Sequence, residues 1–201
     1  METLHLSHLP VELSAVHICH VRSLGNAASV LARLKAEGPA AFPLQFALLD
    51  ASKVTSRTHL VVGIHQALLA ASRGSAAMKT RSIHSEILWA LSPSTNIADS
   101  FRLFGLSNST QHLIVVHVAK PEEHGGPSAS DVRQQVASTF EGIVGQADGI
   151  SSGSGGDVDE QGGSEKDWKG IGKTYKIPPG TASPQDIDSL ATSIVAIKSL
   201  T

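Results

Sequence analysis

Apolar positions in the first half of the chain predict strands that alternate with amphipathic helices. Residues 11–21 are rich in β-branched side chains, which favour a buried strand. Apolar residues then recur at helical spacing until Gly38 and Pro39, two residue types that are typical of a helix end. The short apolar run at 46–50 predicts either another strand or the entry to a long helix over about 56–72.

The second half of the chain continues this alternation. Apolar spacing, N-cap residues and one β-branched run predict two short helices, a strand and a third helix, at 83–91, 96–104, 113–118 and 131–140. Residues 173–177 predict an edge strand. A final helix is expected from Ser183, which can cap it, with Pro184 at the first helical position. This succession of helices and short strands indicates an α/β or α+β fold.

Composition limits the class of protein. The chain has 201 residues, of which 41% are apolar, enough for one domain with its own core. A net charge of −2 argues against a protein that coats nucleic acid by bulk charge, although a local basic patch is allowed. The lone cysteine, Cys19, excludes an intrachain disulfide, and the N-terminal residues have no signal-peptide pattern. We therefore expect a soluble intracellular domain without a membrane span.

One stretch of the sequence has too little apolar content to contribute to a core. Residues 149–166 consist mainly of glycine, serine and acidic residues, a composition typical of a flexible surface loop or linker. We therefore expect a single domain over residues 1–201 that carries this loop.

The segment Gly172-Lys173-Thr174 resembles the end of a nucleotide-binding P-loop. Such a loop needs a glycine five positions before this segment, a strand ahead of it and a helix after it. Here the fifth position back from Gly172 is Asp167, and two prolines at 178 and 179 prevent a following helix. A turn into an edge strand is therefore the favoured interpretation, and a small nucleotide-binding enzyme remains the rival one.

The other candidates for chemistry have simpler explanations. No His-Glu-x-x-His motif is present, and Cys19 cannot complete a thiolate set. We therefore interpret the histidines as surface residues or hydrogen-bonded core residues, and Cys19 as a small buried hydrophobe. There is no Gly-x-Ser-x-Gly elbow and no kinase signature. We expect a binding or regulatory protein without catalytic residues, metal or cofactor. The ten histidines are His5, His8, His17, His20, His59, His65, His84, His112, His117 and His124.

A short basic segment precedes the helix predicted at 83–91. Lys79 and Arg81, together with Arg73, place three cations within nine residues with no acid among them. The hydroxyl and N–H groups of Thr80 and Ser82 add donors for an anion, so the segment can hold phosphates. A solvated charge cluster with a helix cap is the alternative.

The predicted final helix carries a wide apolar stripe. Ile187, Leu190, Ile194 and Ile197 stand at spacings of i, i+3, i+7 and i+10. The stripe either packs on the domain's own core or serves a partner.

Residues 78–118 together resemble one known family. The elements are 78–87 (Met-Lys-Thr-Arg-Ser-Ile-His-Ser-Glu-Ile), 91–93 (Leu-Ser-Pro), 96–97 (Asn-Ile), 104–106 (Phe-Gly-Leu) and 113–116 (Leu-Ile-Val-Val). They resemble the TPRKB (PRPK-binding protein) family, the small subunit of the EKC/KEOPS complex that binds the atypical kinase of that complex. A Tyr-Lys segment at 173–177 and a C-terminal helix extend the similarity, whereas the stretch at 149–166 departs from the family pattern.

The resemblance implies a compact α/β domain with a central mixed sheet flanked by helices and without catalytic activity. Members bind the small lobe of the kinase and contact tRNA at its 3′ CCA end. They support threonylcarbamoyl-adenosine formation next to the anticodon, which a separate subunit carries out, and in fungi the complex is linked to telomere maintenance. A location in nucleus and cytoplasm is expected.

The resemblance gives both surviving features a role. Leu190, Ile194 and Ile197 are expected to bind the kinase, and Arg73, Lys79, Thr80 and Arg81 to bind tRNA. Two alternatives stay open. The segment 79–81 can serve only to orient the next helix, and the terminal helix can form homodimers.

Overall fold

The protein is described by a computed structural model that covers residues 1–145, 166–178 and 183–198. Its centre is a sheet in the order β1-β2-β4-β3, with β5 paired to β2. All strand pairings in these ranges are antiparallel, so the expected mix of strand directions is absent. The strands are β1 (Glu2–His5), β2 (Ala15–Arg22), β3 (Ala47–Asp50), β4 (Leu113–Ala119) and β5 (Ile143–Gly145).

Strands β2 and β4 form the centre because their side chains can be buried on both faces. Nearly every residue of the two strands is buried, and Cys19 lies opposite Val115 in the register. Runs of β-branched and other apolar residues suit such a doubly covered position. The run at 46–50 is a strand, and the strand predicted at 11–21 starts only at Ala15, after a short 3₁₀ turn.

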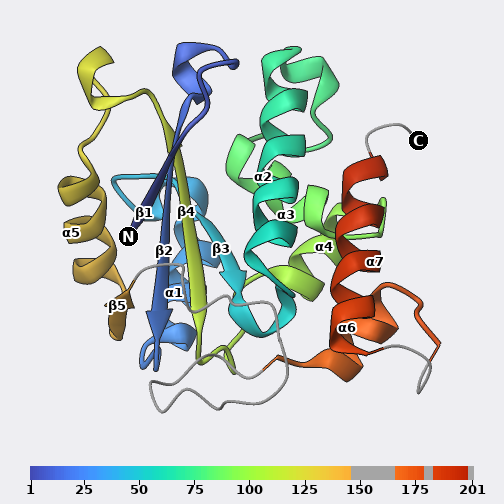
Figure 1. The fold of residues 1–201 in the computed structure, drawn as a ribbon. Coiled ribbons are helices and arrows are strands. Elements are labelled where there is room, and N and C mark those ends of the chain that lie inside the picture. The colour runs from blue at the N-terminus through green and yellow to red at the C-terminus, as the bar shows by residue number, and fades with distance from the viewer. Residues whose placement is uncertain (146–165, 179–182, 199–201) are drawn as a thin grey trace.

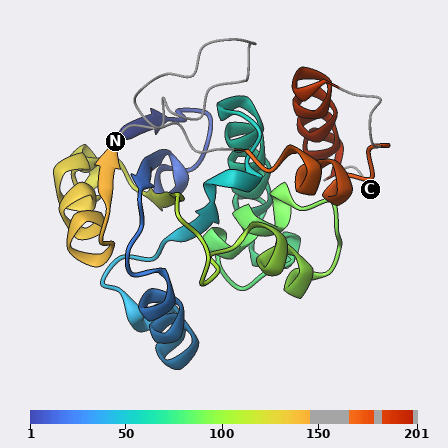
Figure 2. The same ribbon diagram turned by 90° about the horizontal axis from the view of Figure 1, so that it is seen from below.

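Helices cover both faces of the sheet (Figures 1 and 2). The larger core holds Ile18 and Val116 against α2, α3, α4, α6 and α7, and the smaller core holds Cys19 and Val115 against α1 and α5. The α+β class is thereby confirmed. The helices are α1 (Ala27–Glu37), α2 (Arg57–Ser72), α3 (Ile83–Leu91), α4 (Ile97–Phe104), α5 (Ala129–Thr139), α6 (Trp168–Thr174) and α7 (Pro184–Ile197).

The edge strand predicted at 173–177 is wrong, because Lys173 and Thr174 form the end of helix α6 and residues 175–177 follow it as a turn without strand pairing. The Asp167 side chain accepts the N–H of Gly170 at 2.8 Å and so caps the helix. Ile171 and Tyr175 are one helical turn apart and are both buried. A β-carbon at Gly170 would lie 2.1 Å from the Asp167 carboxylate, so the glycine makes room for the cap.

The stretch at 149–166 lies outside the described residues except for Lys166. Among the helices that are described, none combines the length and the apolar character that a membrane crossing requires.

Candidate functional site

The basic segment before α3 wraps around a buried carboxylate. Glu86 is only 1% exposed and accepts the backbone N–H groups of Lys79 and Thr80 at 2.8–3.1 Å, and the Thr80 hydroxyl at 2.7 Å. The Ser82 hydroxyl accepts the N–H of Ser85 and so caps α3. The N–H and hydroxyl of Thr80 and the hydroxyl of Ser82, the donors expected to hold a phosphate, are therefore already paired within the chain. This geometry supports the alternative that the segment orients α3.

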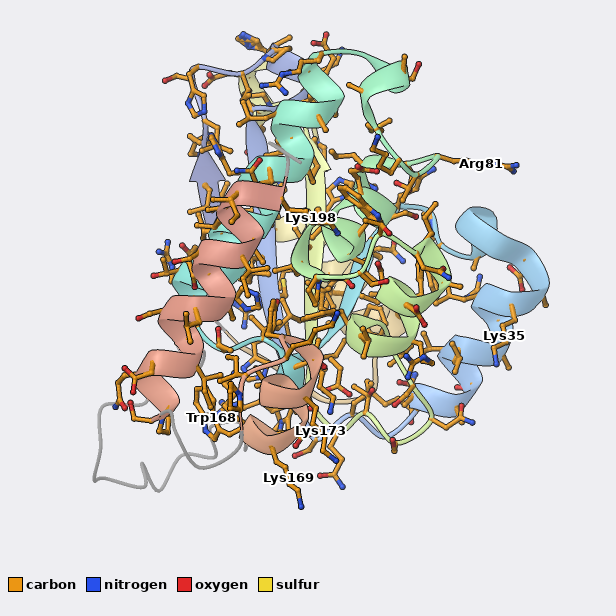
Figure 3. All side chains as sticks on the ribbon, turned by 90° about the vertical axis from the view of Figure 1, so that its right-hand side faces the viewer. Lys35, Arg81, Trp168, Lys169, Lys173 and Lys198 are labelled. Atoms are coloured by element: carbon orange, nitrogen blue, oxygen red, sulfur yellow. The ribbon has the colours of Figure 1, made fainter. Side chains whose placement is uncertain are left out.

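The cations of the predicted tRNA site do not share one surface. Arg73 and Lys79 line a cavity of about 430 Å³ between α2, α3 and the end of α7, and Lys198 lies on the same wall. Arg81 is exposed and projects away from that wall, well apart from Lys198 (Figure 3). The structure thus brings Arg73 and Lys79 together and separates Arg81 from them.

Lys198 closes the C-terminal end of α3, a function that the sequence did not indicate. Its ammonium group donates to the carbonyls of Trp89, Ser92 and Ser94 and lies 3.5 Å from the centre of the Trp89 ring. Helix ends leave carbonyls without partners, and Pro93 prevents further helix here. Burial lowers the pKa of Lys198 to about 8, and the nearby Glu86 opposes this shift. The end of α7 is thereby fastened to α3.

A second series of hydrogen bonds attaches α6 to α3. The N–H of Thr55 donates to Nδ1 of His59 at 3.2 Å, so the neutral ring carries its proton on Nε2. His59 Nε2 then donates to the Tyr175 hydroxyl at 2.8 Å, which donates to the Leu91 carbonyl at 2.6 Å. Burial lowers the pKa of His59 to about 4 and raises the pKa of Tyr175. Both groups are therefore neutral at pH 7, as this chain of bonds requires.

Helix α7 divides its apolar stripe between two faces. Ile187 is buried in the larger core, together with Ala191 and Val195. Leu190 and Ile197 face solvent, with 46% and 55% of their surface exposed. Ile194 is half-buried and packs against the core. Two of the three residues predicted to bind the kinase are therefore accessible, and the third is partly structural.

A second cavity, which the sequence analysis missed, lies between α1, α3 and α4. It measures about 460 Å³, and Phe42, Phe46 and Phe101 contribute aromatic rings to its lining. Phe101 is 43% exposed, and Lys35 is the charged residue among the described residues of the lining. The sequence predicted the helix at 96–104, but the cavity arises only because α1 packs opposite α4.

The remaining candidates for chemistry are the histidines, Cys19 and the segment 172–174. Within the described parts of the chain, no three His, Cys, Asp or Glu side chains are placed to hold a metal ion. Burial raises the pKa of the Cys19 thiol to about 11, which keeps it protonated. Gly172, Lys173 and Thr174 form the last turn of α6 instead of a loop around a phosphate.

An α+β domain with exposed apolar side chains on α4, β5 and α7, and with lined cavities beside its helices, is typical of a binding protein. The sequence profile of the family described as kinase binding protein CGI-121 matches residues 21–199. Since this match spans most of the chain, the protein belongs to the CGI-121 family of kinase-binding proteins.

Similar proteins are named as subunits of the EKC/KEOPS complex. The chain is 43% identical over 119 residues to an EKC/KEOPS complex subunit cgi121 of Aspergillus fumigatus, and 40% identical over 125 residues to the CGI121 subunit of Gibberella zeae. These alignments cover 59% and 62% of the chain and 60% of each relative, so the chain spans less than two thirds of their length. The Yarrowia lipolytica subunit is 27% identical over 180 residues, which are 90% of the chain and 89% of that protein.

Proposed function

We propose that this protein is a non-catalytic regulatory subunit of an EKC/KEOPS complex and binds the small lobe of its atypical kinase through α7. The observation that carries the proposal is the exposure of Leu190 and Ile197 on a helix whose opposite face is buried. The family description and the names of the relatives support it. Burial of these two side chains in an interface contributes about 1–2 kcal/mol each before the cost of association is subtracted.

Substitutions of the two exposed residues test kinase binding. Leu190→Arg and Ile197→Arg should each weaken binding of the kinase at least tenfold, because each places a charge in an apolar interface. Ile143→Arg is the matched control, since Ile143 is 60% exposed on β5, at the far side of the sheet. Ile194 is a poorer test because it also packs against the core. Unchanged kinase affinity in both α7 variants, with native thermal melting, would refute this interface.

We further propose that the protein binds tRNA and so supports threonylcarbamoyl-adenosine formation next to the anticodon. The cavity between α1, α3 and α4 suits the single-stranded 3′ end, because such ends bind by stacking on aromatic rings beside cations. Phe101 offers an exposed ring, and Lys35 a cation, in that cavity. Arg81 immediately precedes Ser82, which lines the cavity. Arg73 and Lys79 contribute to tRNA binding through their charge alone, and Thr80 contributes by holding the loop before α3 in place.

Two variants and a shortened RNA test this contact. Phe101→Ala and Arg81→Glu should each weaken tRNA binding about three- to thirtyfold, a range set by base stacking and phosphate contacts. A tRNA without its last three nucleotides should bind the wild type as weakly as intact tRNA binds Phe101→Ala. Equal affinity for intact and shortened tRNA would place the 3′ end elsewhere. Action in nucleus and cytoplasm, and a part in telomere maintenance, belong to the same proposal.

A further inference from the structure

The outer face of α6 carries a row of lysines that neither proposed interface uses. Lys169 and Lys173 stand four residues apart and therefore share one face of the helix, and Lys176 lies two residues beyond the end of the helix. All three residues are exposed. Lys169 and Lys173 project from α6 at the end of the molecule remote from Arg81 (Figure 3). We call these three residues the lysine row.

The packing of α6 fixes the direction of the lysine row. Asp167 caps the start of the helix, and Ile171 and Tyr175 are buried against the core. The hydroxyl of Tyr175 is additionally bonded to α3. With these residues held on the inner face of α6, Lys169 and Lys173 must lie on the outer face.

Among the residues that the structure describes, no acidic side chain forms an ion pair with the lysine row. None of its side chains takes part in a hydrogen bond or ion pair with another described residue. Asp167 lies near enough to Lys173 for the charges to interact, but its oxygens already accept from Lys53 and from the N–H of Gly170. The uncompensated charge therefore favours an anionic partner.

The surroundings of the row indicate the chemistry of that partner. Protein interfaces rely on buried apolar or aromatic anchors, and membrane surfaces on apolar side chains that insert. The large hydrophobic residues that are exposed in the described chain lie on α4, β5 and α7, and none lies on α6. Flexible ammonium groups without such anchors fit the phosphate backbone of a nucleic acid.

We propose that Lys169, Lys173 and Lys176 form a second RNA-binding surface, which contacts the backbone of the tRNA whose 3′ end occupies the α1–α3–α4 cavity. This inference rests on the tRNA part of the proposed function. The row contacts the RNA by charge and without reading its sequence. Because it lies far from Arg81, the RNA must extend across the molecule from the cavity to α6.

The salt dependence of tRNA binding tests the row. We compare the wild type with the double variant Lys169→Gln, Lys173→Gln, using an unmodified tRNA transcript at several salt concentrations. Each lost phosphate contact should reduce the slope of log affinity against log salt by about 0.7–0.9, so the double variant loses about 1.5. The affinity at 0.1 M salt should fall roughly tenfold.

The double variant Lys120→Gln, Arg133→Gln removes the same charge from exposed positions elsewhere and should leave the slope unchanged. The shortened tRNA should remain sensitive to the lysine row, since the contact does not involve the 3′ end. An unchanged slope in the α6 variant, while the wild type binds tRNA, would overturn this inference alone. Absence of tRNA binding by the wild type would overturn the proposed tRNA function as well. Loss of kinase binding in the α6 variant, with tRNA binding intact, would assign the row to a protein partner and also overturn the inference.

Discussion

Tyr175→Phe tests how the C-terminal helices are held on the rest of the domain. The substitution removes one oxygen and keeps the aromatic ring, whose contacts with His59 and Phe104 persist. Two buried groups then lose their partner: the Nε2–H of His59 and the carbonyl of Leu91. The backbone of α6 need not move, because the ring fills the same space.

The expected loss of stability follows from these two groups. A buried donor or acceptor that loses its partner costs about 1–3 kcal/mol. We therefore expect Tyr175→Phe to lower the free energy of unfolding by about 2–4 kcal/mol. For a chain of this length, each kcal/mol corresponds to roughly 2–4 °C in the melting temperature.

Urea unfolding of four proteins measures this effect. They are the wild type, Tyr175→Phe, His59→Leu and the double variant, compared by their unfolding midpoints at constant m-value. In the His59→Leu background the Tyr175→Phe cost should fall by about 1–2 kcal/mol, since only the Leu91 carbonyl then loses a partner. A cost below about 0.5 kcal/mol in the wild-type background would refute the reasoning.

Two further predictions concern the buried charges and histidines. Glu86→Gln should destabilise the protein by about 1–3 kcal/mol. An amide oxygen then replaces a carboxylate that accepts from Lys79 and Thr80, and the new NH₂ group gains no acceptor. Chemical denaturation measures the change in stability, and an unchanged stability would show that the loop does not depend on the charge of Glu86. Acid should also destabilise the fold. Burial lowers the pKa values of His59 and His84 to about 4 and 3, below the unfolded value of 6.5, so the unfolded state binds more protons in this window. Stability is therefore full above pH 6.5 and falls by up to about 1.4 kcal/mol per histidine and pH unit as the pH drops toward 4; a melting temperature that is constant from pH 6.5 to 5 would contradict it.

The main elements of the fold could be predicted from the sequence because their signals are local. The β-branched run at 113–118 and the apolar spacing of 56–72 depend only on neighbouring residues. Helix α6 could not be predicted, since its two glycines disfavour a helix and its start depends on one capping carboxylate, Asp167. The antiparallel arrangement of the sheet depends on long-range pairing, which spacing does not encode.

The candidate site was predictable only in part. The stripe of α7 was recognised, but its division into a buried and an exposed half depends on the width of the core beneath it. In the basic segment, the three cations were recognised, whereas the partner of its backbone N–H groups, Glu86, follows only once α3 folds back over the loop. Phe101 and Lys198 gain their roles from elements that are distant in the sequence.

A calorimetric titration of this protein into the KEOPS kinase of the same organism tests the central claim most directly. We predict saturable one-to-one binding with a negative heat-capacity change, because Leu190 and Ile197 leave water. Absence of binding between two folded proteins, or binding that Leu190→Arg and Ile197→Arg leave unchanged, would contradict the account.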